Sequence, residues 1–112
     1  MRHVAEKHEP LSEPVFLILT SLAEGPQHGY AIIKDIEALS GGRVVLSTGT
    51  LYGALRRMLQ DRWIERFEAE DTSRDKQSYR LTPAGRACLA ADLARLRSLG
   101  RAAAARLRTG EA

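Results

Sequence analysis

The stretch that decides the fold is Ser47–Leu59, STGTLYGALRRML, which has the apolar spacing of a helix but contains two glycines. On a helical wheel of about 100 degrees per residue, one side is apolar and predicts a buried stripe of Leu51, Leu55 and Met58. The opposite side consists of Gly49, Gly53, Arg56 and Gln60, with Thr50, Arg57 and Tyr52 at its flanks. A glycine inside a helix costs about 1 kcal/mol relative to alanine. Two glycines on one exposed face therefore need an explanation.

The exposed face has the composition of a helix that lies in the major groove of DNA. Glycine lets another backbone approach closely, arginine and glutamine recognise guanine and adenine edges, and threonine can contact a base or a phosphate. The helix N-terminus at Ser47 and Thr48 favours phosphate through its N–H groups and dipole. We therefore predict DNA contact, with Arg56 and Gln60 as base-reading candidates. The alternative is an exposed face without a ligand. The candidate contacts in this helix are Ser47, Thr48, Gly49, Thr50, Tyr52, Gly53, Arg56, Arg57 and Gln60.

The segments around this helix predict a mainly α fold with a small β-hairpin. Ser12 and Thr82 are expected helix caps, each with a proline in the following turn. Stripes of apolar residues fall at Val15, Leu19 and Leu22, and at Ile32, Ile36 and Leu39. The expected helices are 12–23, 28–39, 48–60 and 83–108, the expected strands are 63–68 and 77–81, and 43–46 is an expected extended bridge. Three helices followed by a two-stranded ribbon form a winged helix-turn-helix.

The chain divides into three expected parts: a flexible arm over 1–10, the winged helix-turn-helix over 11–82, and a C-terminal dimerisation helix and tail over 83–112. In the last part, apolar residues alternate by four and three as in a coiled-coil seam. The alternative is a helix that packs only on its own domain. The candidate dimerisation residues are Leu89, Leu93, Leu96, Ala103 and Leu107.

Composition excludes several function classes. The 112 residues allow one domain, and the net charge of +3 is mildly basic. No apolar run approaches the roughly 20 residues that span a bilayer, so we expect no membrane partner and a cytoplasmic location. One cysteine excludes a disulfide framework. Neither a metal-ligand spacing nor a catalytic constellation is present, so we expect no metal, no cofactor and no enzyme activity.

Three motifs together resemble the PadR-like transcriptional regulators. They are HGY at 28–30, STGTLYGALRRM at 47–58 and SYRLTPAGR at 78–86. The similarity covers about 11–90, and the short C-terminal region resembles the subfamily that ends in a single long helix. The resemblance implies a homodimeric winged-helix repressor that binds double-stranded operator DNA of approximate two-fold symmetry. It also implies a response to a small aromatic or hydrophobic effector.

The resemblance also assigns residues. It places Ser47, Thr48, Gly49, Thr50 and Tyr52 at the recognition helix and the DNA backbone, and His28 and Tyr30 near phosphate. It places Lys76 in the wing. The family usually has a pair of basic residues there, and Arg74 could take the place of the second one.

Two departures from the family pattern stand out. The wing reads KQSY at 76–79, with one basic residue and one tyrosine fewer than usual. Arg62 occupies a position that is often glycine, where a left-handed helix cap suits glycine best. The thinner wing leaves open an alternative function, a winged-helix module that binds protein and not DNA.

Overall fold

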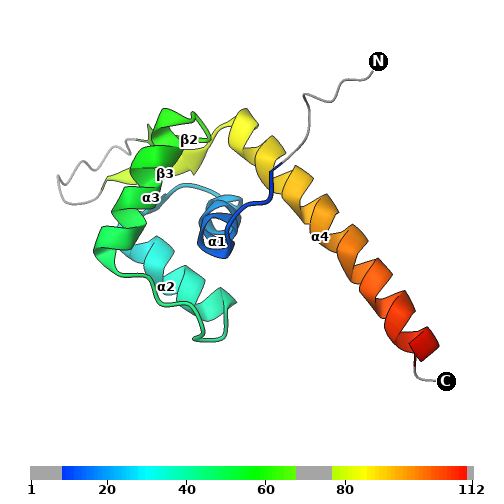
Figure 1. Cartoon of the computed structure of the whole chain (residues 1–112). Coiled ribbons are helices and arrows are strands. Elements are labelled where there is room, and N and C mark those ends of the chain that lie inside the picture. The colour runs from blue at the N-terminus through cyan, green and yellow to red at the C-terminus, as the bar shows by residue number, and fades with distance from the viewer. Residues whose placement is uncertain (1–8, 68–76, 111–112) are drawn as a thin grey trace, which may run out of the picture.

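The computed structural model describes residues 9–67 and 77–110, and within them it has four helices and one small sheet (Figure 1). The elements are α1 (Glu13–Leu22), β1 (Gln27–His28), α2 (Gly29–Leu39), α3 (Thr48–Gln60), β2 (Ile64–Phe67), β3 (Ser78–Leu81) and α4 (Pro83–Gly110). The mainly α winged helix-turn-helix is confirmed. The segment 1–8, which covers most of the expected N-terminal arm, lies outside the described residues.

Three helices begin at a serine or threonine cap, and two of these caps, Ser12 and Thr82, are the ones that the sequence predicts. The Oγ of Ser12 accepts a hydrogen bond from the backbone N–H of Val15, and Ser47 accepts one from Thr50 at 3.1 Å. Thr82 Oγ1 accepts one from the N–H of Gly85 at 3.0 Å. Serine and threonine are preferred at this position because their side chains satisfy N–H groups that the helix leaves without partners.

The core lies where α1, α2 and α3 meet, and it confirms the apolar stripe of α3. Leu51, Leu55 and Met58 are all buried, and they join Ile18, Leu19, Ile32 and Ile36 in one cluster. One expected core residue is wrong, because Leu39 is 50% exposed. It is the last residue of α2, and the chain turns away from the core at Gly41 and Gly42, which both have positive φ. The buried stripe of α2 therefore ends at Ile36.

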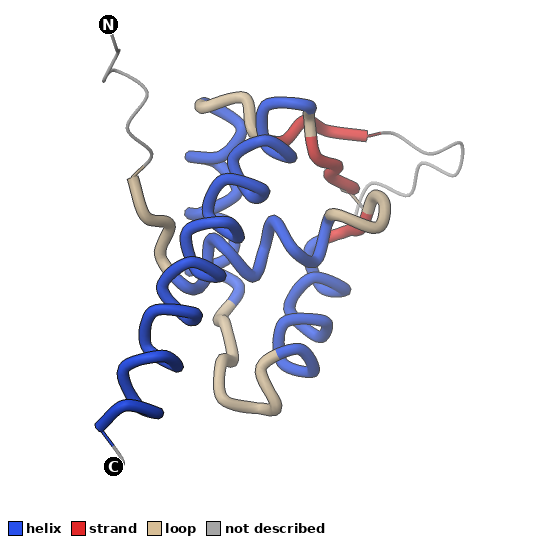
Figure 2. Tube along the Cα trace, turned by 90° about the vertical axis from the view of Figure 1, so that its right-hand side faces the viewer, coloured by secondary structure: helices blue, strands red, loops and turns tan. Residues whose placement is uncertain are grey.

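The sheet has the order β1-β3-β2 and is antiparallel. Its third strand is β1, in which Gln27 lies opposite Tyr79, and the extended bridge expected at 43–46 is wrong. That segment turns back on α2 instead, because the N–H of Val44 donates to Ser40 Oγ at 2.9 Å and the N–H of Arg43 to the Ser40 carbonyl. Figure 2 shows the strands at one end of the molecule and the C-terminus of α4 at the other.

The residues that follow α3 contact the first turn of α4. Arg62 adopts φ 64°, and the N–H groups of Arg62 and Trp63 donate to the carbonyls of Leu59 and Met58. This is the helix ending that usually requires glycine. Thr82 Oγ1 donates to the Arg62 carbonyl at 2.7 Å, and a Cβ added to Gly85 would lie 2.0 Å from the Trp63 carbonyl oxygen. The first turn of α4 is therefore held close against the end of α3.

The helix α4 has 28 residues and extends well beyond the rest of the protomer (Figure 1). Its first turns pack on α1 and β3, whereas every residue from Leu96 to Gly110 is exposed. In the described part of the chain, no helix is both long and apolar enough to cross a membrane.

Candidate nucleic-acid interface

The outer face of α3 is open. Gly49, Arg56, Arg57 and Gln60 are exposed, and Gly53 is partly so. A Cβ added to Gly49 would meet nothing within 4 Å, and one added to Gly53 would meet only Arg56 Nη2 at 3.9 Å. Packing within the protomer therefore does not require either glycine. An external partner that approaches the helix backbone closely would explain both.

The N-terminus of α3 carries hydroxyl groups that face solvent. Ser47, Thr48 and Thr50 are all exposed, and Ser47 Oγ donates to Thr50 Oγ1 at 3.0 Å. The predicted contacts from 47 to 50 are thus brought together on one turn. Hydroxyls and helix N-termini are frequent partners of DNA phosphates.

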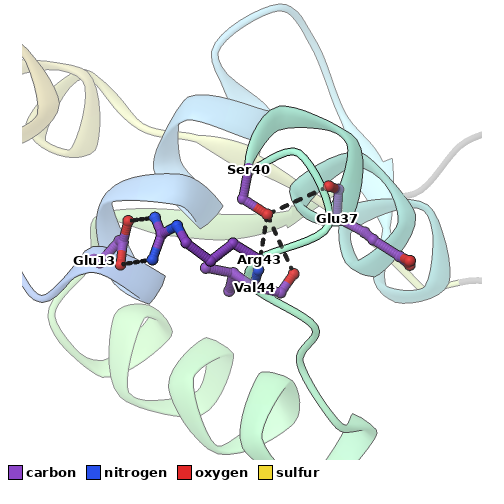
Figure 3. A network of polar contacts seen from close by, with 5 residues as sticks. All are labelled: Glu13, Glu37, Ser40, Arg43 and Val44. Carbon is purple, nitrogen blue, oxygen red and sulfur yellow. Dashed lines mark hydrogen bonds and ion pairs between the residues drawn. The ribbon is translucent and has the colours of Figure 1, made fainter.

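The loop that leads into α3 is fixed by the polar contacts of Figure 3. Ser40 Oγ donates to the Glu37 carbonyl, and the guanidinium of Arg43 forms a two-pronged ion pair with the carboxylate of Glu13 in α1. The hydrogen bonds from Arg43 hold the pKa of Glu13 below its usual value. Both side chains are more than half exposed, so the pair contributes little to stability. It does commit Arg43 to a partner within the protein.

Two of the sequence motifs meet in space, because Tyr52 of α3 lies on Gly29 at the start of α2. A Cβ on Gly29 would lie 2.2 Å from Tyr52 Oη, so any larger residue would displace the ring. Tyr52 is still 39% exposed. The predicted DNA-contacting residue thus also sets the distance between α2 and α3, which the separate motifs did not indicate.

The start of α2 presents further candidate contacts. His28 ends β1 and precedes α2, where its imidazole makes no capping hydrogen bond. Tyr30 is 65% exposed, and the ammonium of Lys34 lies 5.7 Å from its ring centre. Lys34 is a cation beside one predicted contact, Tyr30, and sequence reasoning missed it. Its spacing of four residues from Tyr30 on one helix face was the available signal.

The wing is described only at its base. Arg74 and Lys76, the predicted wing contacts, lie outside the described residues. On one face Arg80 donates to Glu65 at 2.7 Å and lies over the Phe67 ring at 4.9 Å. On the other face Tyr79 is buried, and burial raises the pKa of its phenol. Phe67 and Tyr79 are therefore occupied in packing the ribbon.

A groove of about 820 Å³ runs beside α3, between that helix and the segment that enters α1. Gly49, Gly53, Arg56 and Arg57 line one wall, and Leu11 and Pro14 belong to the other. The two glycines and both arginines of the predicted DNA-reading face therefore border one concave surface.

The candidate dimerisation residues on α4 fall into two groups. Leu89 is partly buried against the core of its own protomer. Leu93, Leu96, Ala103 and Leu107 are exposed, Leu96 at 41% and Leu107 at 69%. These four side chains form an apolar stripe that the protomer does not cover.

Other reactive groups have structural roles. Burial raises the pKa of the Cys88 thiol, which disfavours a reactive thiolate. Asp92 is buried and accepts hydrogen bonds from Arg95 and from the N–H of Leu11. Within residues 9–67 and 77–110, no group of three or more His, Cys, Asp or Glu residues could hold a metal ion.

Comparison with known proteins agrees with this architecture. The model of the transcriptional regulator PadR-like family matches residues 18–91. An uncharacterized 37.1 kDa protein in transposon TN4556 of Streptomyces fradiae is 45% identical over 73 residues, which are 65% of this chain. The chain spans only 20% of the length of that relative.

Solved structures share the fold. A PadR family transcription regulator from Clostridium difficile R20291 superposes with a TM-score of 0.71 and 24% identity, over 86% of this chain and 99% of that one. Bacillus subtilis PadR in complex with operator DNA superposes with a TM-score of 0.64 and 24% identity, over 75% of this chain and 48% of that one. Because the family match runs from α1 into α4 and covers well over half of the chain, this protein belongs to the PadR-like family, whose members are transcriptional regulators and not enzymes.

Proposed function

We propose that this chain binds DNA sequence-specifically, with α3 in the major groove. The observation that carries the proposal is the outer face of α3, where two glycines that packing within the protomer does not require lie beside Arg56 and Gln60. Tyr30 and Lys34 extend a basic and aromatic surface along α2. Bacillus subtilis PadR, which has the same fold, forms a complex with operator DNA, and this supports DNA binding by the present chain.

The proposed form is a homodimer joined along α4. All residues from Leu96 to Gly110 of α4 are exposed. An isolated helix of about 12–15 residues is only marginally stable in water, so a partner along this end of α4 would stabilise it. A second copy laid along Leu93, Leu96, Ala103 and Leu107 would cover the apolar stripe. The two α3 helices would then reach successive major grooves, about 34–36 Å apart.

The proposed regulation is repression that a small hydrophobic or aromatic effector relieves, in the cytoplasm. A groove of about 390 Å³ between α1 and α4, lined by Leu11, Phe16, Leu17 and Leu96 among others, offers an apolar surface next to the proposed dimer seam. A ligand at that place would contact both protomers and could change their relative orientation.

Arg56→Ala tests the reading face. We expect the loss of about 1–3 kcal/mol of discrimination at a single base position, because one guanidinium recognises one base edge. Fluorescence anisotropy would be measured across a salt series, on a duplex that the wild-type chain selects from a random library and on single-base variants of it. Arg97→Ala, an exposed arginine of α4 with the same charge change, is the matched control.

A uniform loss on all sequences would reduce Arg56 to a phosphate contact. If the wild-type chain selected no duplex, the proposed DNA binding would be wrong. The alternative, a winged-helix module that binds protein, would then be favoured.

Gly53→Ala tests the reason for the glycines. Because the new methyl group meets only the end of the Arg56 side chain, at an ordinary contact distance of 3.9 Å, we expect the free energy of unfolding to rise by about 0.5–1 kcal/mol. The same methyl group would stand between α3 and a docked duplex, so we expect affinity for the selected duplex to fall by about tenfold, or 1.4 kcal/mol. Urea unfolding and anisotropy would be measured on one preparation. Greater stability with unchanged affinity would show that the face does not approach DNA closely.

A further inference from the structure

A partly buried polar cluster joins three elements away from the outer face of α3. Ser21 of α1 is 3% exposed, and its Oγ donates to Asp35 Oδ2 of α2 at 2.8 Å. The side-chain amide of Gln27 in β1 donates to the same Ser21 Oγ at 2.8 Å and to the Ser21 backbone carbonyl at 2.6 Å.

The hydrogen bonds in this cluster fix one another. A serine hydroxyl has one donor, and here Asp35 accepts it, so the oxygen of Ser21 remains to accept from Gln27. The Ser21 carbonyl lies in the last turn of α1, where carbonyls lack partners within the helix. Gln27 therefore caps the end of α1 from a different element. If Gln27 lost its amide, a buried carbonyl and a buried hydroxyl would both lose a donor, which is costly.

Gln27 is one of only two residues in β1, so its side-chain hydrogen bonds have a large share in holding this strand in place. A two-residue strand makes few backbone hydrogen bonds, so they alone hold it weakly. Yet β1 pairs with β3, and β3 pairs in turn with β2 to form the base of the wing. On its other side, β1 ends at His28 and α2 begins at the next residue, Gly29. The placement of Gln27 thus bears on the wing and on the helix start beneath Tyr52.

We propose that Gln27 is a positioning residue, whose amide, held by Ser21, keeps β1 against β3 and so sets the wing and the start of α2 relative to α3, while Asp35 orients the Ser21 hydroxyl. The residue lies on the inner side of the sheet with Tyr79, and it acts on DNA only through these elements. Its effect on DNA rests on the proposed function. Its effect on the sheet does not.

Gln27→Leu removes the donor and keeps a side chain of similar size. Amide hydrogen exchange of the free protein, followed residue by residue, is the first readout. We expect exchange in β1 and β3 to accelerate about tenfold more than exchange at Leu51 and Leu55 in α3, because a local contact is lost. Ile18→Val, which weakens the core without touching the cluster, is the control and should accelerate all of these amides alike.

Affinity for the selected duplex is the second readout. We expect about a tenfold loss with Gln27→Leu and little change with Ile18→Val. Adding Ser21→Ala to Gln27→Leu should cause little further loss, because Gln27→Leu already removes the hydrogen bond between the two side chains.

Equal acceleration of β1, β3 and α3 amides by Gln27→Leu would overturn the inference, whatever the protein binds. Selective acceleration without loss of affinity, in a wild-type chain that does bind DNA, would also overturn it. A wild-type chain that binds no duplex would refute the proposed function, and the exchange readout would still decide whether Gln27 positions the sheet.

Discussion

Arg62 adopts a backbone conformation that ordinarily belongs to glycine. At φ 64° it completes the ending of α3, and its carbonyl accepts the hydroxyl of Thr82. A left-handed conformation costs a residue with a Cβ about 1–2 kcal/mol. The PadR-like family often has glycine at this position. In this protein arginine forms the same left-handed turn.

We therefore expect Arg62→Gly to raise the free energy of unfolding by about 0.5–1 kcal/mol, since relief of strain exceeds the added entropy of the unfolded chain. Urea denaturation would measure it. The neighbouring Asp61 has an ordinary helical φ of −80°, so Asp61→Gly should lower stability instead. A shift of both variants in the same direction would contradict the role assigned to the positive φ.

At the scale of elements, the junction of α3 and α4 depends on a glycine with no room above it. A Cβ on Gly85 would lie 2.0 Å from the Trp63 carbonyl oxygen. We expect Gly85→Ala to lower the free energy of unfolding by about 1–3 kcal/mol through overpacking. Gly53→Ala, at a helical glycine where a Cβ would make no close contact, is its matched opposite and should stabilise. Thermal and urea unfolding of both variants would decide, and equal effects would refute the close approach.

The helices were predictable from the sequence, whereas several contacts between them were not. Caps and apolar periods predicted α3 and its buried stripe because both signals are local. The strand β1 was missed because two residues have no period, and Leu39 continued a pattern that ends one turn earlier in space. The contact of Tyr52 with Gly29 joins two motifs 23 positions apart, a distance that no local signal spans.

At the scale of the whole molecule, the exposed stripe on α4 predicts the oligomeric state. We expect the wild-type chain to sediment as a dimer and the Leu96→Glu, Leu107→Glu double variant as a monomer, because buried carboxylates would disfavour the seam. Neither leucine belongs to the core of the protomer, so the winged helix should stay folded. Sedimentation equilibrium and circular dichroism would measure both.

Ala105→Glu, on the opposite side of α4, is the control and should remain dimeric. A monomeric wild-type chain, or three proteins that sediment alike, would contradict the seam.

The junction at Gly85 has a consequence for how the protein could measure DNA. Thr82 and Gly85 hold the first turn of α4 against the residues that end α3, so we expect these two helices to turn together. At about 1.5 Å per residue, α4 is a rod of roughly 42 Å. If two such rods cross at the dimer seam, their crossing angle alone fixes the gap between the two α3 helices. A molecule that bound where the two α4 helices cross and widened their angle would then move the α3 helices apart. It would release DNA without contacting either α3 helix.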